Sequence, residues 1–196
     1  MIRILLLTSL SLLFSSCLSI TQEVSSYDTY SLMLNNKTLF KNKIKESIEI
    51  IEPKSLGSLN SLNIVYKNEN LSQENYALSK WSDKPSKMLQ SMIIENLSNE
   101  YYLVKSSYIK AQTTYRLQGL ILDFKQFYIN NKSYVSIKIN NYLENKANKK
   151  TVFKQFSYEK ETQGENANST VVDLNLLSNL YVKDLNLWIK EELNNN

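Results

Sequence analysis

The sequence contains no histidine, and it has one cysteine, two prolines and three glycines in 196 residues. Without histidine the chain cannot form a Ser-His-Asp or Cys-His nucleophile, and it lacks a side chain that most zinc sites use. Its single cysteine, Cys17, excludes an intrachain disulfide. The glycines Gly57, Gly119 and Gly164 form no phosphate-binding cluster, so we expect neither a metal nor another cofactor.

Positive and negative charges are nearly balanced, with 23 lysines and arginines against 19 aspartates and glutamates. Basic and acidic residues are interspersed, as expected of a solvated surface, and this balance argues against nucleic acid as a partner. Glu159 and Glu161 would share one face of a strand, where two carboxylates could act as acid and base. They lie among polar residues beside a loop, so we predict that the protein is not an enzyme.

Residues 1–16 have the pattern of a cleaved secretory signal peptide. One arginine precedes an apolar run from Ile4 to Phe14, and two serines then lead to Cys17. The run is too short for a permanent transmembrane helix, which needs roughly 20 apolar residues. The small residues before the cysteine resemble the lipobox of bacterial lipoproteins, although Phe14 stands where leucine is usual. An ordinary signal peptide cleaved at another position is the alternative.

We predict that Cys17 becomes the first residue of the mature chain and carries three acyl chains, palmitate among them. Each buried CH₂ contributes about 0.8 kcal/mol, so three chains give a permanent anchor. Residues 17–26 are mostly small and polar and predict a tether with a reach of about 30 Å at full extension. The absence of aspartate after Cys17 favours the outer membrane, with the domain on its periplasmic face.

Residues 27–196 are predicted to form a single α+β domain with a mainly antiparallel sheet. Alternating apolar and polar residues predict short strands at 27–34, 43–51, 62–66, 74–81 and 101–107. Short polar loops join three longer segments, which predict a long three-strand antiparallel meander over 113–129, 133–143 and 151–162.

Two helices complete the predicted domain. Asp83 and Pro85 are typical of a helix N-terminus and predict one central helix that starts there. A wide apolar stripe predicts one long C-terminal helix over 171–193, which covers the sheet or, alternatively, contacts another subunit. The apolar phase of 113–129 changes near Gly119, which indicates a β-bulge there or a change of covering face.

Aromatic and apolar residues also recur in a characteristic order along nearly the whole mature chain. They are Tyr30-Ser31-Leu32, Ile48 to Pro53, Ile64-Val65-Tyr66, Tyr76, Trp81 to Pro85, Tyr115-Arg116-Leu117, Leu120, Phe124, Gln126-Phe127, Phe153, Phe156 and Leu187-Trp188-Ile189. In this order they resemble the ABC-type transport auxiliary lipoproteins, partners of MCE (mammalian cell entry) type lipid-transport systems. Because most are packing residues, the resemblance specifies a fold better than a partner.

The resemblance implies an outer-membrane component that docks the MCE-domain protein of an ABC transporter for lipids or other hydrophobic compounds, with a homo-oligomer as a further expectation. Tyr76, Trp81 and Trp188 are the aromatic candidates for an interface, and packing in the core is the alternative for the two tryptophans. Rival functions are lipopolysaccharide assembly, activation of a peptidoglycan synthase, and cell-wall hydrolysis. Synthase activators normally need a longer linker than residues 18–26 provide.

Overall fold

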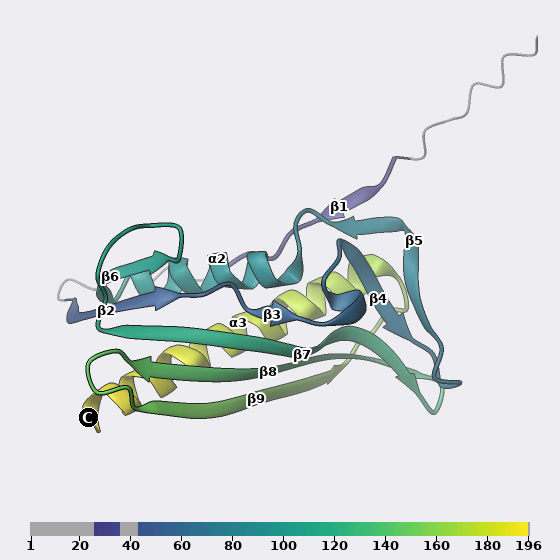
Figure 1. Ribbon diagram of the computed structural model, residues 1–196. Helices are drawn as coiled ribbons and strands as arrows, with labels where there is room; N and C mark the ends of the chain where they lie inside the picture. The colour runs from purple at the N-terminus through teal and green to yellow at the C-terminus, as the bar shows by residue number, and fades with distance from the viewer. Residues whose placement is uncertain (1–25, 36–42, 196) are drawn as a thin grey trace, which may run out of the picture.

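The computed structural model describes residues 26–35 and 43–195 (Figure 1). Its elements in chain order are β1 (Asp28–Tyr30), β2 (Ile44–Ile50), β3 (Lys54–Ser55), the 3-10 turn η1 (Gly57–Leu59), β4 (Asn63–Lys67), β5 (Gln73–Trp81), α2 (Pro85–Ser98), β6 (Tyr101–Ser106), β7 (Tyr115–Ile129), β8 (Lys132–Asn145), β9 (Thr151–Glu161) and α3 (Ala167–Asn194). The predicted signal peptide, Cys17 and all of the tether except Ser26 lie outside the described residues. Within the described ranges, no helix is long and apolar enough to cross a bilayer.

Strand β7 organises the sheet because both of its edges are paired. Along one edge it pairs antiparallel with β8, from Tyr115 opposite Asn145 to Ile129 opposite Lys132, and β9 pairs antiparallel with β8. Along the other edge it pairs in parallel with β2, β3 and β4 in turn. Strand β6 adds in parallel to β2, while β5 lies antiparallel to β4 and parallel to β1.

The α+β class and the long C-terminal helix are therefore present, but the sheet is mixed, and the prediction of a mainly antiparallel sheet is wrong. Alternation within a segment reveals a half-buried strand without revealing its neighbours. Parallel neighbours require crossover connections. Here β2 is brought beside β7 and β6 only after β4, β5 and α2 have intervened in the chain.

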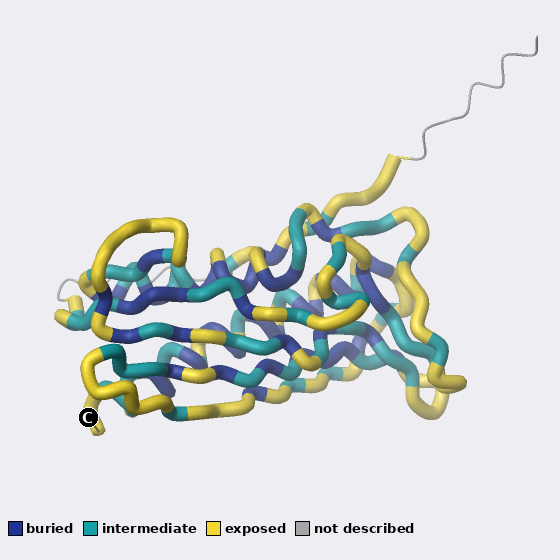
Figure 2. Tube along the Cα trace, in the orientation of Figure 1, coloured by how far each residue is buried: buried dark blue, intermediate teal, exposed yellow. Residues whose placement is uncertain are grey.

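Both helices pack on the sheet and on each other. Helix α2 contacts β2 and β6, while α3 runs along β7, β8 and β9 (Figure 1). Buried positions alternate with exposed ones along the strands (Figure 2). Between helices and sheet lies a core whose largest fully buried side chains include Trp81, Tyr101, Tyr181, Ile48, Ile50, Leu89, Ile137 and Ile139. Burial of these apolar side chains, at about 25 cal/mol per Å², provides the main stabilisation of the fold.

Helix α2 begins at Pro85, as the sequence predicts, but its cap differs from the predicted one. The N-cap residue is Lys84, which makes no side-chain cap bond. The carboxylate of Asp83 accepts a hydrogen bond from the Lys84 amide at 2.8 Å and pairs with Lys87 at 3.2 Å. Asp83 thus fixes the entry to the helix without capping its first turn.

The predicted bulge exists, although not at Gly119. The register of β7 against β8 shifts between Ile121 and Asp123, which places the extra residue at Leu122. Gly119 remains in register, and a Cβ at this position would approach the Cβ of Pro53 to 3.1 Å. Because Gly119 has no side chain, the β2–β3 connection can pack closely on the sheet at this position.

Candidate docking surface

The face of β8 and β9 opposite the helices is open to solvent. Side chains at alternating positions of β9 line it and are exposed: Thr151, Phe153, Gln155, Ser157, Glu159 and Glu161. The positions between them face α3, as the T-shaped contact of Phe156 with Trp188 shows. One side of the sheet is thus available to a partner along the length of β9.

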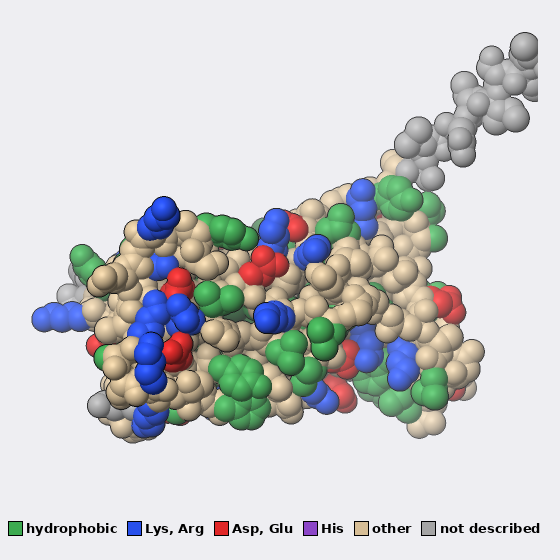
Figure 3. Space-filling model, in the orientation of Figure 1, with side chains coloured by type: hydrophobic (Ala, Val, Ile, Leu, Met, Phe, Trp, Pro, Cys, Tyr) green, Lys and Arg blue, Asp and Glu red, His purple; other side chains and the backbone are tan. Residues whose placement is uncertain are grey.

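A row of charged side chains crosses this open side near the start of β7. Neighbouring strands place four of them side by side in register: Lys105 of β6, Glu49 of β2, Arg116 of β7 and Glu144 of β8. Together with Lys146 and Lys149 of the β8–β9 turn, we call them the charged row. In Figure 3 its blue and red side chains gather at one end of the face shown.

Glu49 is the centre of the charged row. Its Oε1 lies 2.9 Å from Lys105 Nζ, and its Oε2 lies 3.0 Å from Arg116 Nε and 3.0 Å from Lys146 Nζ. Burial raises the pKa of Glu49, but hydrogen bonds from the three cations outweigh it and lower the pKa to about 2. Lys105 is only 3% exposed, so its charge depends on this carboxylate for compensation.

The charged row carries an excess of positive charge. Glu144 pairs with Arg116 at 3.5 Å and with Lys149 at 3.7 Å. Four cations therefore meet two carboxylates within the row. Arg116 is partly exposed and Lys149 mostly exposed, so the excess charge is accessible at the surface. Such a site attracts a negatively charged partner surface.

An exposed aromatic pair lies next to the charged row. Tyr142 of β8 and Phe153 of β9 are register partners, and their ring centroids are 5.2 Å apart. Leu122, pushed outward by the bulge, adds an exposed aliphatic side chain on β7. Tyrosine and arginine are both enriched among the residues that contribute most of the binding energy at protein interfaces.

Two carboxylates beyond the aromatic pair are engaged in contacts of their own. Asp123 pairs with Lys125 at 2.7 Å and accepts a hydrogen bond from the Ser136 hydroxyl at 2.9 Å. Glu161 lies on the exposed side of β9 and pairs with Lys132 at 3.1 Å. No cluster of three or more acidic or cysteine side chains suited to a metal ion occurs among the described residues.

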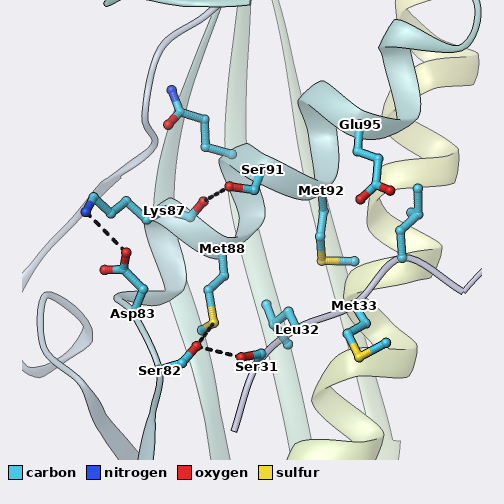
Figure 4. Close-up of a pocket in the computed structure, with 12 residues that line it drawn as sticks. Ser31, Leu32, Met33, Ser82, Asp83, Lys87, Met88, Ser91, Met92 and Glu95 are labelled. Carbon is cyan, nitrogen blue, oxygen red and sulfur yellow. Dashed lines mark hydrogen bonds and ion pairs between the residues drawn. The ribbon is translucent and has the colours of Figure 1, made fainter.

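A hollow of about 510 Å³ lies between α2 and the extended segment 31–34 (Figure 4). Leu32 and Met33 face Met88 and Met92 of the helix across it, and the Ser31 and Ser82 hydroxyls are 2.6 Å apart at one end. The hollow has a mixed apolar and polar lining.

Two asparagines on α3 hold the segment beside this hollow in place. The Asn175 Oδ1 accepts from the Met33 amide at 2.8 Å, and the Asn179 Oδ1 accepts from the Asn35 amide at 2.8 Å. The Asn179 Nδ2 donates to the Met33 carbonyl at 2.9 Å. Side chains four residues apart on one helix face thus replace a strand partner for the extended backbone.

The three aromatic residues predicted as interface candidates lie apart from the open face. Trp81 is 1% exposed and packs on Phe124 with ring centroids 5.7 Å apart, which favours the core interpretation. Trp188 is also buried, and its Nε1 donates to Glu192 at 3.0 Å. Tyr76 is partly buried, and burial raises the pKa of its hydroxyl, which lies 2.9 Å from the Glu165 carbonyl oxygen.

Sequence reasoning missed the charged row and the asparagine pair. Alternation predicts that Glu49 points away from Ile48 and Ile50, which is correct, but it does not predict that three cations bury the carboxylate. The cations come from β6, β7 and the β8–β9 turn, so only the strand order brings them together. No local pattern distinguishes Asn175 and Asn179 from the many other asparagines of the chain.

Comparison with known proteins supports the fold and the resemblance. Residues 30–184 match a family model described as "ABC-type transport auxiliary lipoprotein component". No curated protein matches the sequence.

Two crystal structures share the fold. Protein XCC0632 from Xanthomonas campestris superposes with a TM-score of 0.72 at 12% identity, covering 82% of this chain and 93% of that chain. A second structure, described only as an uncharacterized protein, gives a TM-score of 0.66 at 14% identity and covers 84% of this chain and 99% of that one. At these identities the likeness shows the fold alone.

Proposed function

This chain belongs to the ABC-type transport auxiliary lipoprotein family, and we propose that it is a non-enzymatic docking component that ties a transport system to the outer membrane. A lipid on Cys17 would hold the domain at the periplasmic face. The partner would be the MCE-domain protein of an ABC transporter that moves lipids or other hydrophobic compounds. The action is positional, because the anchor fixes the domain and the domain receives the end of the conduit.

The observation that carries this proposal is the open face of β8 and β9 with the charged row at one end. An excess of cations beside the Tyr142–Phe153 pair fits an interface in which an acidic surface is attracted and an aromatic centre is then desolvated. Glu49 also connects three separate elements, because it binds cations from β6, β7 and the β8–β9 turn.

Several features support a role without catalysis. The sequence has no histidine, and its one cysteine is the proposed lipid site. Of the possible acid and base Glu159 and Glu161, Glu161 is paired with Lys132, and the buried Glu49 is held ionised by cations. A catalytic acid would need a raised pKa, which is the opposite of the shift at Glu49.

Affinity isolation of the full-length protein from native membranes tests the proposed partner. We expect an MCE-domain protein and its ABC transporter among the captured proteins, identified by mass spectrometry. The Cys17→Ser variant is the matched control, because it should leave the outer-membrane fraction while its docking surface is unchanged.

Other captured proteins would select the rivals. A β-barrel of lipopolysaccharide assembly or a peptidoglycan synthase, found in place of an MCE-domain protein, would replace this proposal by an envelope-assembly role. If Cys17→Ser stayed in the outer membrane, the anchor would be wrong, although the docking partner could still be correct.

A further inference from the structure

Two turns meet at the end of the molecule opposite the charged row. They are the β4–β5 turn, residues 68–72, and the β7–β8 turn, residues 130–131, which lie together in Figure 1. The Asn131 amide donates to Glu69 Oε1 at 2.8 Å and so connects them. Within the first turn, the Asn68 amide donates to the Ser72 carbonyl at 2.9 Å. We call residues 68–72 and 129–132 the turn end.

The turn end exposes large apolar side chains. Leu71 is 75% exposed and Ile129 is 51% exposed. Both line one hollow of about 280 Å³ together with Phe127 and Tyr128. Single exposed leucines are common on soluble proteins, but apolar side chains gathered at two connected turn tips indicate a binding surface.

The backbone conformation at Leu71 is unusual for a leucine. Leu71 has a φ of 69°, a left-handed conformation that asparagine and glycine tolerate and that costs other residues about 1–2 kcal/mol. The neighbouring turn follows the rule, with Asn130 at 51° and Asn131 at 58°. A leucine in this conformation is unfavourable for folding, and residues held in such conformations occur most often at functional sites.

The described chain begins at the same end of the molecule as the turn end, with β1 at the upper right of Figure 1 and the two turns at the lower right. β1 pairs in parallel with β5, with Asp28 opposite Ser79 and Tyr30 opposite Trp81. Strand β5 connects these paired residues to the β4–β5 turn, which Gln73 adjoins. From Ser26 to Cys17 are nine residue steps, which span about 30 Å at most. A bilayer that holds Cys17 must then lie within this reach of Ser26, and the turn end is nearer to the start of the described chain than the charged row is (Figure 1).

We propose that the turn end contacts the headgroup region of the phospholipid bilayer, with Leu71 and Ile129 inserted at the boundary with the acyl chains. The proposal rests on membrane attachment through Cys17, which is part of the proposed function. An amphipathic surface binds a bilayer in proportion to the apolar area that it buries there, and an anchor already in the membrane makes even a weak contact effective.

Charged groups at the turn end are compatible with this position. Glu69 accepts the Asn131 amide, and Glu74 accepts the Tyr66 hydroxyl at 2.6 Å. Lys132 pairs with Glu161 at 3.1 Å. These polar groups can remain at headgroup level while the two aliphatic side chains reach deeper. The charged row would then point away from the membrane, about 40 Å distant along β7 at about 3.3 Å per residue.

Tryptophan fluorescence can test this placement with a chemically supplied anchor. The mature chain, residues 17–196, is coupled through its only cysteine, Cys17, to a maleimide-bearing phospholipid in phosphatidylethanolamine–phosphatidylglycerol vesicles. The native Trp81 and Trp188 are both buried and give a constant background. Leu71→Trp and Ile129→Trp report on the turn end. Ile109→Trp is the control, because Ile109 is 56% exposed in the β6–β7 connection, beside the start of β7.

In vesicles with brominated acyl chains, we expect the added emission of Leu71→Trp and Ile129→Trp to be quenched and shifted to the blue. Ile109→Trp should show neither effect. In an Ile129→Trp background, Leu71→Asn should reduce the quenching, and circular dichroism verifies that each variant is folded. Equal emission from brominated and plain vesicles at both positions would overturn the proposal.

The vesicles contain no partner protein and the lipid is attached chemically. A negative result therefore leaves docking and lipidation in the cell unaffected. Conversely, failure of the affinity isolation would leave the quenching result unchanged.

Discussion

The two ends of the β7–β8 hairpin differ in which side chains they bury and which they expose. Where Tyr115 pairs with Asn145, the sheet buries charges, with Glu49 and Lys105 almost inaccessible. Where the hairpin turns, Leu71 and Ile129 are exposed. Each end reverses the usual distribution of polar and apolar residues. Opposite reversals at the two ends of one long hairpin fit the two proposals, in which a protein partner binds one end and lipid contacts the other.

Removal of the central carboxylate should have the largest effect on stability. Glu49→Gln leaves the buried Lys105 charge without its partner, and breaking a buried ion pair in this way typically costs about 3–5 kcal/mol. Urea denaturation monitored by circular dichroism measures the change.

Glu161→Gln is the matched control at the turn end, because Glu161 forms an exposed pair with Lys132. It should unfold at the same urea concentration as the wild type. If both variants lost the same stability, the two ends would not differ in the way that the structure indicates.

The pH dependence of the free energy of unfolding should show the contribution of the Glu49 carboxylate. The pKa of Glu49 is about 2 in the folded protein, against an ordinary value of 4.5. A folded-state pKa that is lowered gives stability that is fully present above about 4.5 and is lost as the pH falls toward 2. Wild type should therefore lose stability across this window, while Glu49→Gln should show a smaller decrease. Parallel pH profiles for the two proteins would contradict the assignment.

The difference between the two ends of the hairpin depends largely on which strands are neighbours in the sheet, and the sequence does not reveal this order. The strands are predictable because apolar residues such as Ile48 and Ile50 alternate with polar ones, and helix α2 is predictable from Pro85. Their order in the sheet is not, because the parallel neighbours of β7 are set by crossovers. The charged row follows from that order, so it too was beyond prediction.

The aromatic candidates illustrate the same limit. Trp81 beside helix-start residues fits either a core or an interface, and only the position of Phe124 across the sheet favours the core. Leu71, by contrast, lies in the turn between β4 and β5, close to Asn68 and Asn70 in the sequence. Its positive φ is a property of the folded turn and has no signature in the sequence.

A variant that removes the backbone strain at Leu71 should change stability and membrane contact in opposite directions. Leu71→Asn places a residue that tolerates left-handed φ at this position and should raise the free energy of unfolding by about 1 kcal/mol. The same change should weaken quenching of the Ile129→Trp reporter.

Leu71→Ala is the matched control, because it removes the apolar side chain without relieving the backbone. It should lose membrane contact and gain no stability. If Leu71→Asn were less stable than the wild type, the leucine side chain would be stabilising the domain through packing, and the argument from its φ would fail.

The smallest expected change in stability comes from reversing one exposed charge at either end of β8. Lys149 follows β8 in the charged row and pairs with Glu144 at 3.7 Å, whereas Lys132 starts β8 at the turn end and pairs with Glu161 at 3.1 Å. Both lysines are exposed, so Lys149→Glu and Lys132→Glu should melt like the wild type.

Their effects on docking should differ, because only Lys149 belongs to the cationic excess that faces the proposed partner. We expect Lys149→Glu to weaken binding of the captured MCE-domain protein about fivefold at low salt and less at high salt, since exposed charges are screened. Lys132→Glu should bind as the wild type does, and an equal loss for both variants would place the partner elsewhere on the domain.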